Sequence, residues 1–151
     1  MANTQAMCTS FKGELLVGHH NFGIGVIRAA TTADTFKAAL YLASATVSAA
    51  TTAYSATDEV SGTGYTAGGV TVTFGTVPAT SGTTAFVTPS ASITYSAVTL
   101  STAFDCVLIY NSTQSNKAVS VHTFGSQTVT AGTFTLTMPT NDASTGLIRL
   151  A

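Results

Sequence analysis

The three histidines are the first residues to consider for chemistry, because an imidazole can bind a metal or act as a general base near neutral pH. His19 and His20 are adjacent, so on a strand their side chains would point to opposite faces. His122 follows Val119 and Val121 in an alternating segment, where we expect the valines to face inward and the histidine outward. A zinc site needs more ligands than these spacings supply. We therefore expect no metal site.

The six carboxylates include one close pair, Asp58 and Glu59. Glycosidases need two acids that face each other across the substrate, and neighbours in sequence seldom do so. We expect a solvated loop or a calcium-favouring turn at this pair. The glycine-rich residues 61–69 lack the spacing of a dinucleotide-binding fingerprint and precede a strand-like segment instead of a helix. We expect a long β-loop there, with glycines at positive φ angles.

The chain contains no recognisable motif for nucleophilic catalysis. None of the 15 serines stands in a Gly-x-Ser-x-Gly elbow. Cys8 and Cys106 lie 98 positions apart with no second cysteine nearby, which favours buried, reduced thiols. Asn111, Ser112 and Thr113 form a glycosylation sequon, which we interpret as a turn between two strands. We expect no enzymatic activity, no catalytic residue and no cofactor.

Composition limits the kinds of protein to which the chain can belong. With 151 residues and 15.3 kDa, residues 1–151 fit a single domain. Only 7% of the residues are charged and the net charge is −1, while 30 threonines and 15 serines supply most of the polar side chains. A surface with so little charge resists association poorly. We therefore expect a subunit that associates with itself or with other proteins.

The basic residues do not form a patch for nucleic acid, because they are scattered along the chain. They are Lys12, Arg28, Lys37, Lys117 and Arg149. No run of about 18 apolar residues suggests a membrane span, and residues 1–18 lack the pattern of a signal peptide. We expect a protein that binds neither nucleic acid nor membranes and stays in the cytoplasm where it is made.

Beyond residue 34 the apolar residues recur with a period of two, which is typical of β-strands. Gly, Pro, Asn and Ser separate most of these segments. We predict strands at residues 35–43, 69–74, 84–88, 92–98, 106–110, 117–124, 133–138 and 147–150. The segment 45–56, rich in Ala, Thr and Ser, is interpreted as a loop or an edge segment. The predicted fold class is all-β: an antiparallel β-sandwich or jelly roll of about eight strands.

Two parts of the chain depart from this pattern. Residues 9–18 begin with a hydroxyl N-cap, carry apolar side chains at Phe11, Leu15 and Leu16, and end on glycine, which predicts one short N-terminal helix. Residues 1–8 lack a clear pattern and are interpreted as a possible extended N-terminal arm that lies on a neighbour. Residues 106–110 are apolar throughout, which predicts a strand covered on both faces, at the centre of the sandwich or in a subunit interface.

A set of short motifs covers nearly the whole chain. They are residues 7–16 (MCTSFKGELL), 36–41 (FKAALY), 59–69 (EVSGTGYTAGG), 108–112 (LIYNS), 116–119 (NKAV) and 147–149 (LIR). Together they resemble a family of small structural proteins encoded by tailed bacteriophages. The resemblance implies a virion component, favouring a capsid decoration or cement protein that binds and stabilises the assembled head. The alternative is a tail- or fibre-associated structural or attachment protein.

The resemblance also implies partners and a location. We expect the chain to bind itself, as a dimer or trimer, and the major capsid protein. It would then reside in the virion after synthesis in the cytoplasm of the host bacterium. Candidate interface residues are the apolar and aromatic side chains Phe11, Leu15, Leu16, Tyr65, Val107 and Ile109.

Overall fold

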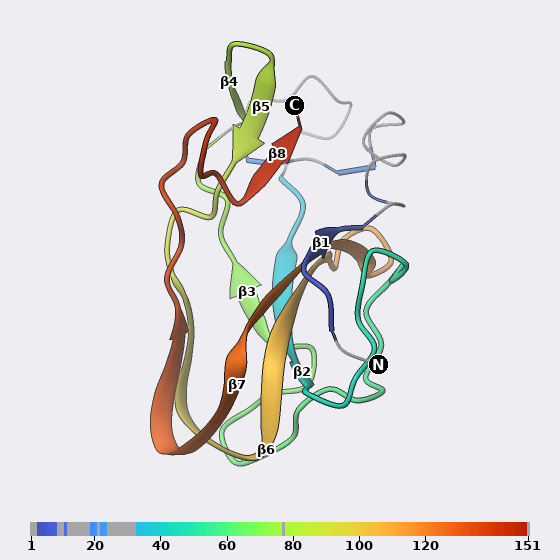
Figure 1. Ribbon diagram of the computed structural model, residues 1–151, viewed down its shortest axis with the longest axis vertical. Helices are drawn as coiled ribbons and strands as arrows, with labels where there is room; N and C mark the ends of the chain where they lie inside the picture. Colours follow the sequence, from blue (N-terminus) through green and yellow to red (C-terminus); the bar gives the residue numbers. More distant parts are fainter. Residues whose placement is uncertain are drawn as a thin grey trace.

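The computed structural model describes residues 3–8, 11, 19–20, 22–23, 33–76 and 78–150 (Figure 1). The strands are β1 (Ala6–Met7), β2 (Phe36–Leu42), β3 (Val70–Val72), β4 (Ala79–Ser81), β5 (Thr84–Val87), β6 (Ile93–Asn111), β7 (Lys117–Leu136) and β8 (Ile148–Leu150). They form two antiparallel sheets, of five and three strands, which confirms the predicted all-β, sandwich-like fold class. Within the described part of the chain, no helix is long and apolar enough to cross a membrane.

The larger sheet has the strand order β1-β7-β6-β2-β3. β2 is buried on both faces: Phe36 and Leu40 point to one side, Ala39 and Tyr41 to the other, and none of the four is more than 3% exposed. β2 pairs with β6 along its whole length, but with β3 only as far as Ala38. One edge of β2 therefore needs other partners for its remaining backbone groups.

β6 and β7 form one long antiparallel hairpin. The pairing runs from Asn111 and Lys117, beside the turn, to Ile93 and Leu136 at the far end. The prediction of two separate strands in each of these segments is wrong, because each pair of predicted strands is one continuous strand. The small and polar residues in the middle, which suggested turns, lie instead at irregularities within the ladder.

Bulges near the middle of both strands bend this hairpin. Register shifts interrupt the pairing between Tyr95 and Cys106, and Ala97 and Ala131 adopt positive φ angles of 53° and 45°. An extra residue in a strand increases the local twist and bends the strand. In Figure 1 both strands reverse their direction at the bottom of the view.

The outer half of the hairpin covers one face of the inner half. The ring of Phe134 lies 5.0 Å from the ring of Phe104, although the cross-strand partner of Phe134 is Tyr95. Tyr95 in turn reaches β2, where its hydroxyl donates to the carbonyl of Ala38 at 2.9 Å. A single hairpin thereby contributes to two layers of the fold.

The apolar segment 106–110 lies within β6, between β2 and β7. Val107 and Ile109 are 1% and 0% exposed. Of the two alternatives for this segment, the centre of the sandwich is the one observed. The expectation that Val107 and Ile109 face another subunit is wrong for the folded chain, because the chain's own residues cover both side chains.

Residues 3–8 lie against their own chain. β1 pairs with the edge of β7 over two residues. The Asn3 side chain donates to the carbonyl of Leu42 (3.2 Å) and to the Asp105 carboxylate, and it accepts from the amide of Val47 (3.0 Å). The segment interpreted as a possible arm thus adds a strand to the sheet of the single chain. The predicted helix at residues 9–18 falls almost entirely outside the described residues.

The smaller sheet has the order β4-β5-β8 and lies at one end of the molecule, at the top of Figure 1. Ala85 pairs with Leu150 and Val87 with Ile148, so these four side chains share one face of the sheet. β4 was not predicted, because its sequence Ala-Thr-Ser has no apolar alternation and all three residues are exposed.

Candidate functional site

Glu59 is the polar centre of the loop that joins β2 to β3. Its Oε1 accepts hydrogen bonds from the Tyr65 hydroxyl (2.7 Å) and the Gly68 amide (2.8 Å), and its Oε2 accepts from the Tyr54 hydroxyl (2.6 Å). A half-buried carboxylate with three donors is satisfied by its own chain. Asp58, its neighbour, is exposed, whereas Glu59 is half-buried.

Beyond β3, the loop completes the edge of β2: the Leu42 amide donates to the Asp58 carbonyl (3.0 Å) and the Val60 amide donates to the Leu40 carbonyl (3.0 Å). Tyrosine hydroxyls add further hydrogen bonds. The Tyr65 hydroxyl accepts from the Leu40 amide (3.0 Å), the Tyr95 hydroxyl donates to the Ala38 carbonyl (2.9 Å), and the Tyr110 hydroxyl donates to the Gly68 carbonyl (2.8 Å). Burial, with the nearby Glu59 carboxylate, raises the pKa of Tyr65, Tyr95 and Tyr110. These hydroxyls are neutral at pH 7 and are engaged in hydrogen bonds within the chain.

Gly69 allows the glycine-rich loop to approach β2. It adopts a φ angle of +71°, and a Cβ atom there would lie 1.6 Å from the Ala38 carbonyl oxygen. Gly64 and Gly68 also have positive φ angles. The prediction of a β-loop with glycines at positive φ is confirmed.

His122 and Ser120 form a close pair inside the fold. Ser120 Oγ lies 2.9 Å from His122 Nε2 and Ser120 is 2% exposed. The prediction that His122 faces outward is wrong: the side chain is half-buried, its cross-strand partner is Val107, and it lines a cavity of about 120 Å³ together with Ile93 from the outer half of the hairpin. Burial lowers the pKa of His122 to about 4, so the ring is neutral at pH 7 and a weak base.

Asn111 is fully buried, at 0% exposed, and organises the turn between β6 and β7. Its amide nitrogen donates to Asp34 at 2.8 Å and lies 3.2 Å from His20 Nδ1, while its oxygen accepts from two backbone amides of the turn. The turn interpretation of the sequon is confirmed. His20 is 7% exposed, with its ring 4.7 Å from that of Phe11. In the described part of the chain, no three His, Cys, Asp or Glu side chains are placed to hold a metal.

Cys8 and Cys106 are both fully buried, at 0% exposed. This confirms the prediction that Cys8 and Cys106 are buried. Burial, with a smaller contribution from Asp105, raises the pKa of Cys106 to about 12. Cys106 therefore carries almost no thiolate at neutral pH and is not a nucleophile.

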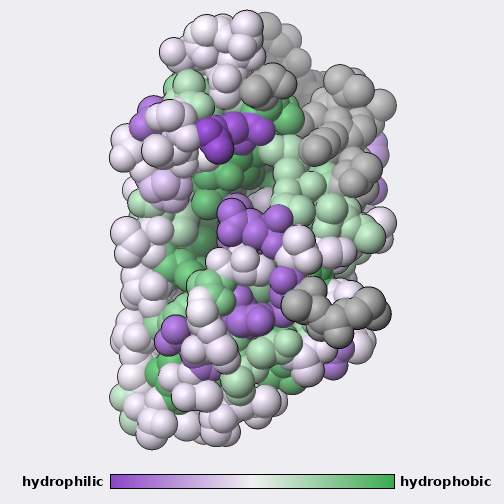
Figure 2. Space-filling view, viewed as in Figure 1, coloured by the Kyte–Doolittle hydropathy of each residue, from purple (hydrophilic) through white to green (hydrophobic). Residues whose placement is uncertain are grey.

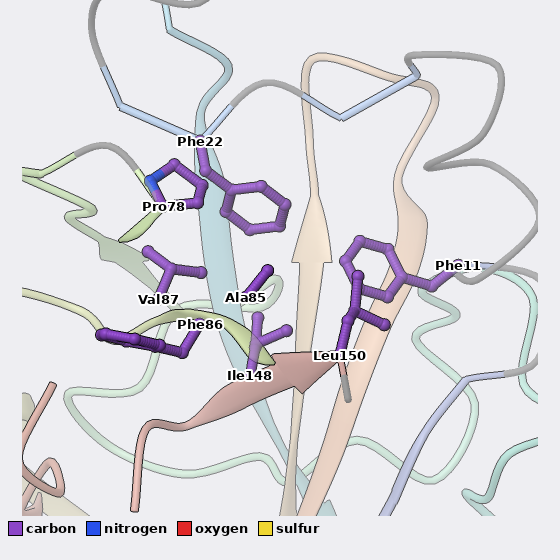
Figure 3. Close-up of a pocket in the computed structure, with 8 residues that line it drawn as sticks. All are labelled: Phe11, Phe22, Pro78, Ala85, Phe86, Val87, Ile148 and Leu150. Atoms are coloured by element: carbon purple, nitrogen blue, oxygen red, sulfur yellow. The ribbon is translucent and has the colours of Figure 1, made fainter. Parts of the chain in front are cut away.

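An apolar pocket of about 110 Å³ lies under the smaller sheet (Figure 3). The rings of Phe11 and Phe22, from the N-terminal part of the chain, face the sheet across it. The other lining residues are Pro78, Ala85, Phe86, Val87, Ile148 and Leu150. Leu150, on the rim, is 39% exposed and is the one large apolar side chain that is exposed among the described residues. The pocket is a candidate contact site for an apolar group of a partner.

Of the predicted interface residues, the structure brings only Phe11 to this pocket, where it is 0% exposed. Tyr65 is half-buried, stacked on Tyr95 and bonded to Glu59. Leu15 and Leu16 lie outside the described residues. Five of the other lining residues lie in the predicted strands 84–88 and 147–150, so the sequence located these elements but not the cavity between them and the N-terminal rings.

No protein family model matches the chain, and neither the curated proteins nor the solved structures contain a match to it. Its function is therefore inferred from its own residues.

Proposed function

We propose that this chain is a non-enzymatic structural protein of a bacteriophage virion, and that it acts as a capsid decoration or cement protein. In this role it binds the assembled head, as a dimer or trimer, through the major capsid protein. The resemblance of its sequence motifs to small phage structural proteins supports the proposal. The loop between β2 and β3 supports it too. The polar network around Glu59 fixes the conformation of this loop, and a rigid loop can serve as a contact surface.

The observation that carries the proposal is how the chain uses its few charges. Among the described charged side chains only Asp58 and Arg149 are exposed, and the others are half-buried. Glu59, Asp105 and Asp142 accept hydrogen bonds from their own chain. The face shown in Figure 2 is mostly pale, the colour of residues with hydropathy near zero. Association of such a surface requires the desolvation of few charges.

The mechanism is stabilisation of a lattice by mass action. A protein that binds only the assembled state stabilises each site by RT ln(1 + [L]/Kd), which is about 2.7 kcal/mol at a hundredfold excess over Kd. A shell repeats this contribution over many sites. The pocket beside Leu150 offers a place where an apolar side chain of the lattice is buried.

The number of copies in purified virions tests the proposal. A decoration protein is expected at hundreds of copies per particle, and particles without it are expected to lose their DNA at lower temperature. A count of a dozen or fewer would favour the tail- or fibre-associated alternative, and absence from virions would contradict both.

Light scattering of the purified chain tests self-association. We expect a mass of two or three chains at tens of micromolar, because symmetric contact hides apolar surface that few charges can keep in solution. A monomeric mass would contradict self-association. It would not bear on attachment to the capsid, which the number of copies in purified virions tests.

A further inference from the structure

The outer half of β7 has one edge that pairs with no other strand among the described residues. β1 pairs with β7 only at Ser120 and Val121. Between residues 122 and 136, the described backbone groups of β7 find hydrogen-bond partners only in β6 and in β7 itself. This half of β7 lies at the left side of Figure 1. Its amides and carbonyls that face away from β6 are therefore open to a further strand.

The chain protects its other strand edges. The strands at the ends of the two sheets, β1, β3, β4 and β8, are only two or three residues long, and β8 carries Arg149. On the opposite side of the hairpin, the glycine-rich loop lies against β6, where the Thr99 amide donates to the Thr63 carbonyl at 2.9 Å. Short strands, charged side chains and covering loops are common ways to keep a sheet edge from pairing with another chain.

The open edge of β7 lacks these protections. It runs from residue 122 to residue 136, and residues 118–141 contain no Asp, Glu, Lys or Arg. Proline, which would remove a backbone donor, is absent from residues 90–138. The bulge near Ala131 bends the strand, but beyond it the register with β6 is regular from Phe134 to Leu136. A straight, uncharged end of the edge is thus available for pairing.

The side chains of this end suit pairing with an identical strand. Thr133 and Thr135 are exposed, whereas Phe134 and Leu136 are half-buried against their own chain. When two copies of one strand pair antiparallel, each side chain lies about 5 Å from a residue of the same segment, so a charge would meet a like charge. Threonine avoids this repulsion and favours the extended conformation.

We propose that two copies of this chain associate through the open edge of β7, antiparallel and around a two-fold axis. The inference rests on the self-association in the proposed function and specifies its symmetry and its surface. Amides and carbonyls of each copy would bond to those of the other, which continues the sheet from one chain into the next. The contact uses the same edge in both copies, so it closes at two chains and excludes a trimer built from it.

Sedimentation equilibrium of two charge variants tests the surface. Thr133→Lys/Thr135→Lys and Thr133→Glu/Thr135→Glu should each weaken dimerisation about tenfold or more, because like charges then face each other. An equimolar mixture of the two should recover dimerisation, since opposite charges meet in the mixed dimer. Ala79→Lys/Ser81→Lys, at two exposed positions of the short edge strand β4, is the matched control and should dimerise as the unaltered chain does.

Amide hydrogen exchange of the unaltered chain tests the same edge without a substitution. Outward-facing amides of residues 133–136 should exchange more slowly as the protein concentration rises, whereas those of β3 should not change. A trimeric mass, unchanged dimerisation of the lysine variant, or exchange at residues 133–136 that is independent of concentration would each overturn the inference. A monomeric chain would overturn it together with self-association, whereas a dimer that tolerates the lysines would overturn it alone. Neither result bears on the virion count.

Discussion

Glu59 supports the loop between β2 and β3 by accepting three hydrogen bonds, from Tyr54, Tyr65 and the Gly68 amide. Glu59→Ala leaves three buried or half-buried donors without an acceptor, so we expect it to lower the free energy of unfolding by about 3 kcal/mol. Glu59→Gln keeps one acceptor oxygen and should cost about half as much. Urea denaturation at pH 7 measures both changes.

The neighbouring acid provides the control for this prediction. Asp58→Asn removes a charge from an exposed side chain that has no hydrogen-bond partner among the described residues, and the free energy of unfolding should stay within about 0.5 kcal/mol of the original. Equal losses for Asp58→Asn and Glu59→Gln would contradict the structural role assigned to Glu59.

His122 makes the stability of the fold depend on pH. Its pKa is lowered to about 4 by burial, against about 6.5 for an unfolded chain, so between these values the unfolded state binds more protons. The free energy of unfolding therefore falls as the pH falls through this window, by about 2 kcal/mol between pH 7 and pH 5 from this residue. Urea denaturation at pH 7 and pH 5 should show that the free energy of unfolding of His122→Gln falls by about 2 kcal/mol less than that of the original chain. An identical pH dependence in the variant would refute the assignment.

The roles of adjacent residues could be separated from the sequence only in part. That Asp58 and Glu59 would not act together followed from their adjacency, and so did the loop. Which of them turns inward depends on Tyr54 and Tyr65, whose hydroxyls come from other parts of the loop. The inward position of His122 depends on the outer half of the hairpin, and local alternation contains no information about that layer.

Among the elements, the β2–β3 connection depends on one glycine. Gly69→Ala places a Cβ atom against the Ala38 carbonyl at a φ angle of +71°, so we expect a loss of about 3 kcal/mol or more in the free energy of unfolding. Gly125→Ala in β7 is the control, because nothing lies within 4 Å of its added Cβ, and it should be neutral or stabilising by less than about 1 kcal/mol. Thermal melting compares the two. Similar melting temperatures for both variants would contradict the prediction.

The strands that were predicted well are those with clear alternation or a continuous apolar run. β2, β3, β5 and β8 match their predictions within two residues at each end. The division of β6 and β7 was missed because Ala97, Ala131 and their neighbours have the composition of turns, while the pairing across the hairpin keeps them within strands. β1 and β4 are too short and too polar for any periodicity to be detected.

For the whole molecule, the two thiols report how often the fold opens. Cys8 lies beside the edge strand β1 and Cys106 within β6, and both are 0% exposed. We expect both to react with a disulfide reagent only after unfolding, so that two thiols are counted in denaturant and fewer than one within minutes in buffer. A chelator should not change the melting temperature. Rapid reaction of two thiols in buffer would contradict the burial.

The folded-back hairpin also determines the order in which the chain can fold. Asn111 and Lys117 close a turn of five residues. Each later pair towards Ile93 and Leu136 then closes only a short additional loop, so the chain loses the entropy of loop closure in small steps. We expect the pairs near the turn to form before the rate-limiting barrier and the far end after it. Ser115→Gly, at a φ angle of 54°, should speed refolding, whereas Ile93→Val should mainly speed unfolding. Stopped-flow kinetics in urea distinguishes these effects, and the reverse pattern would mean that the hairpin closes from its open end.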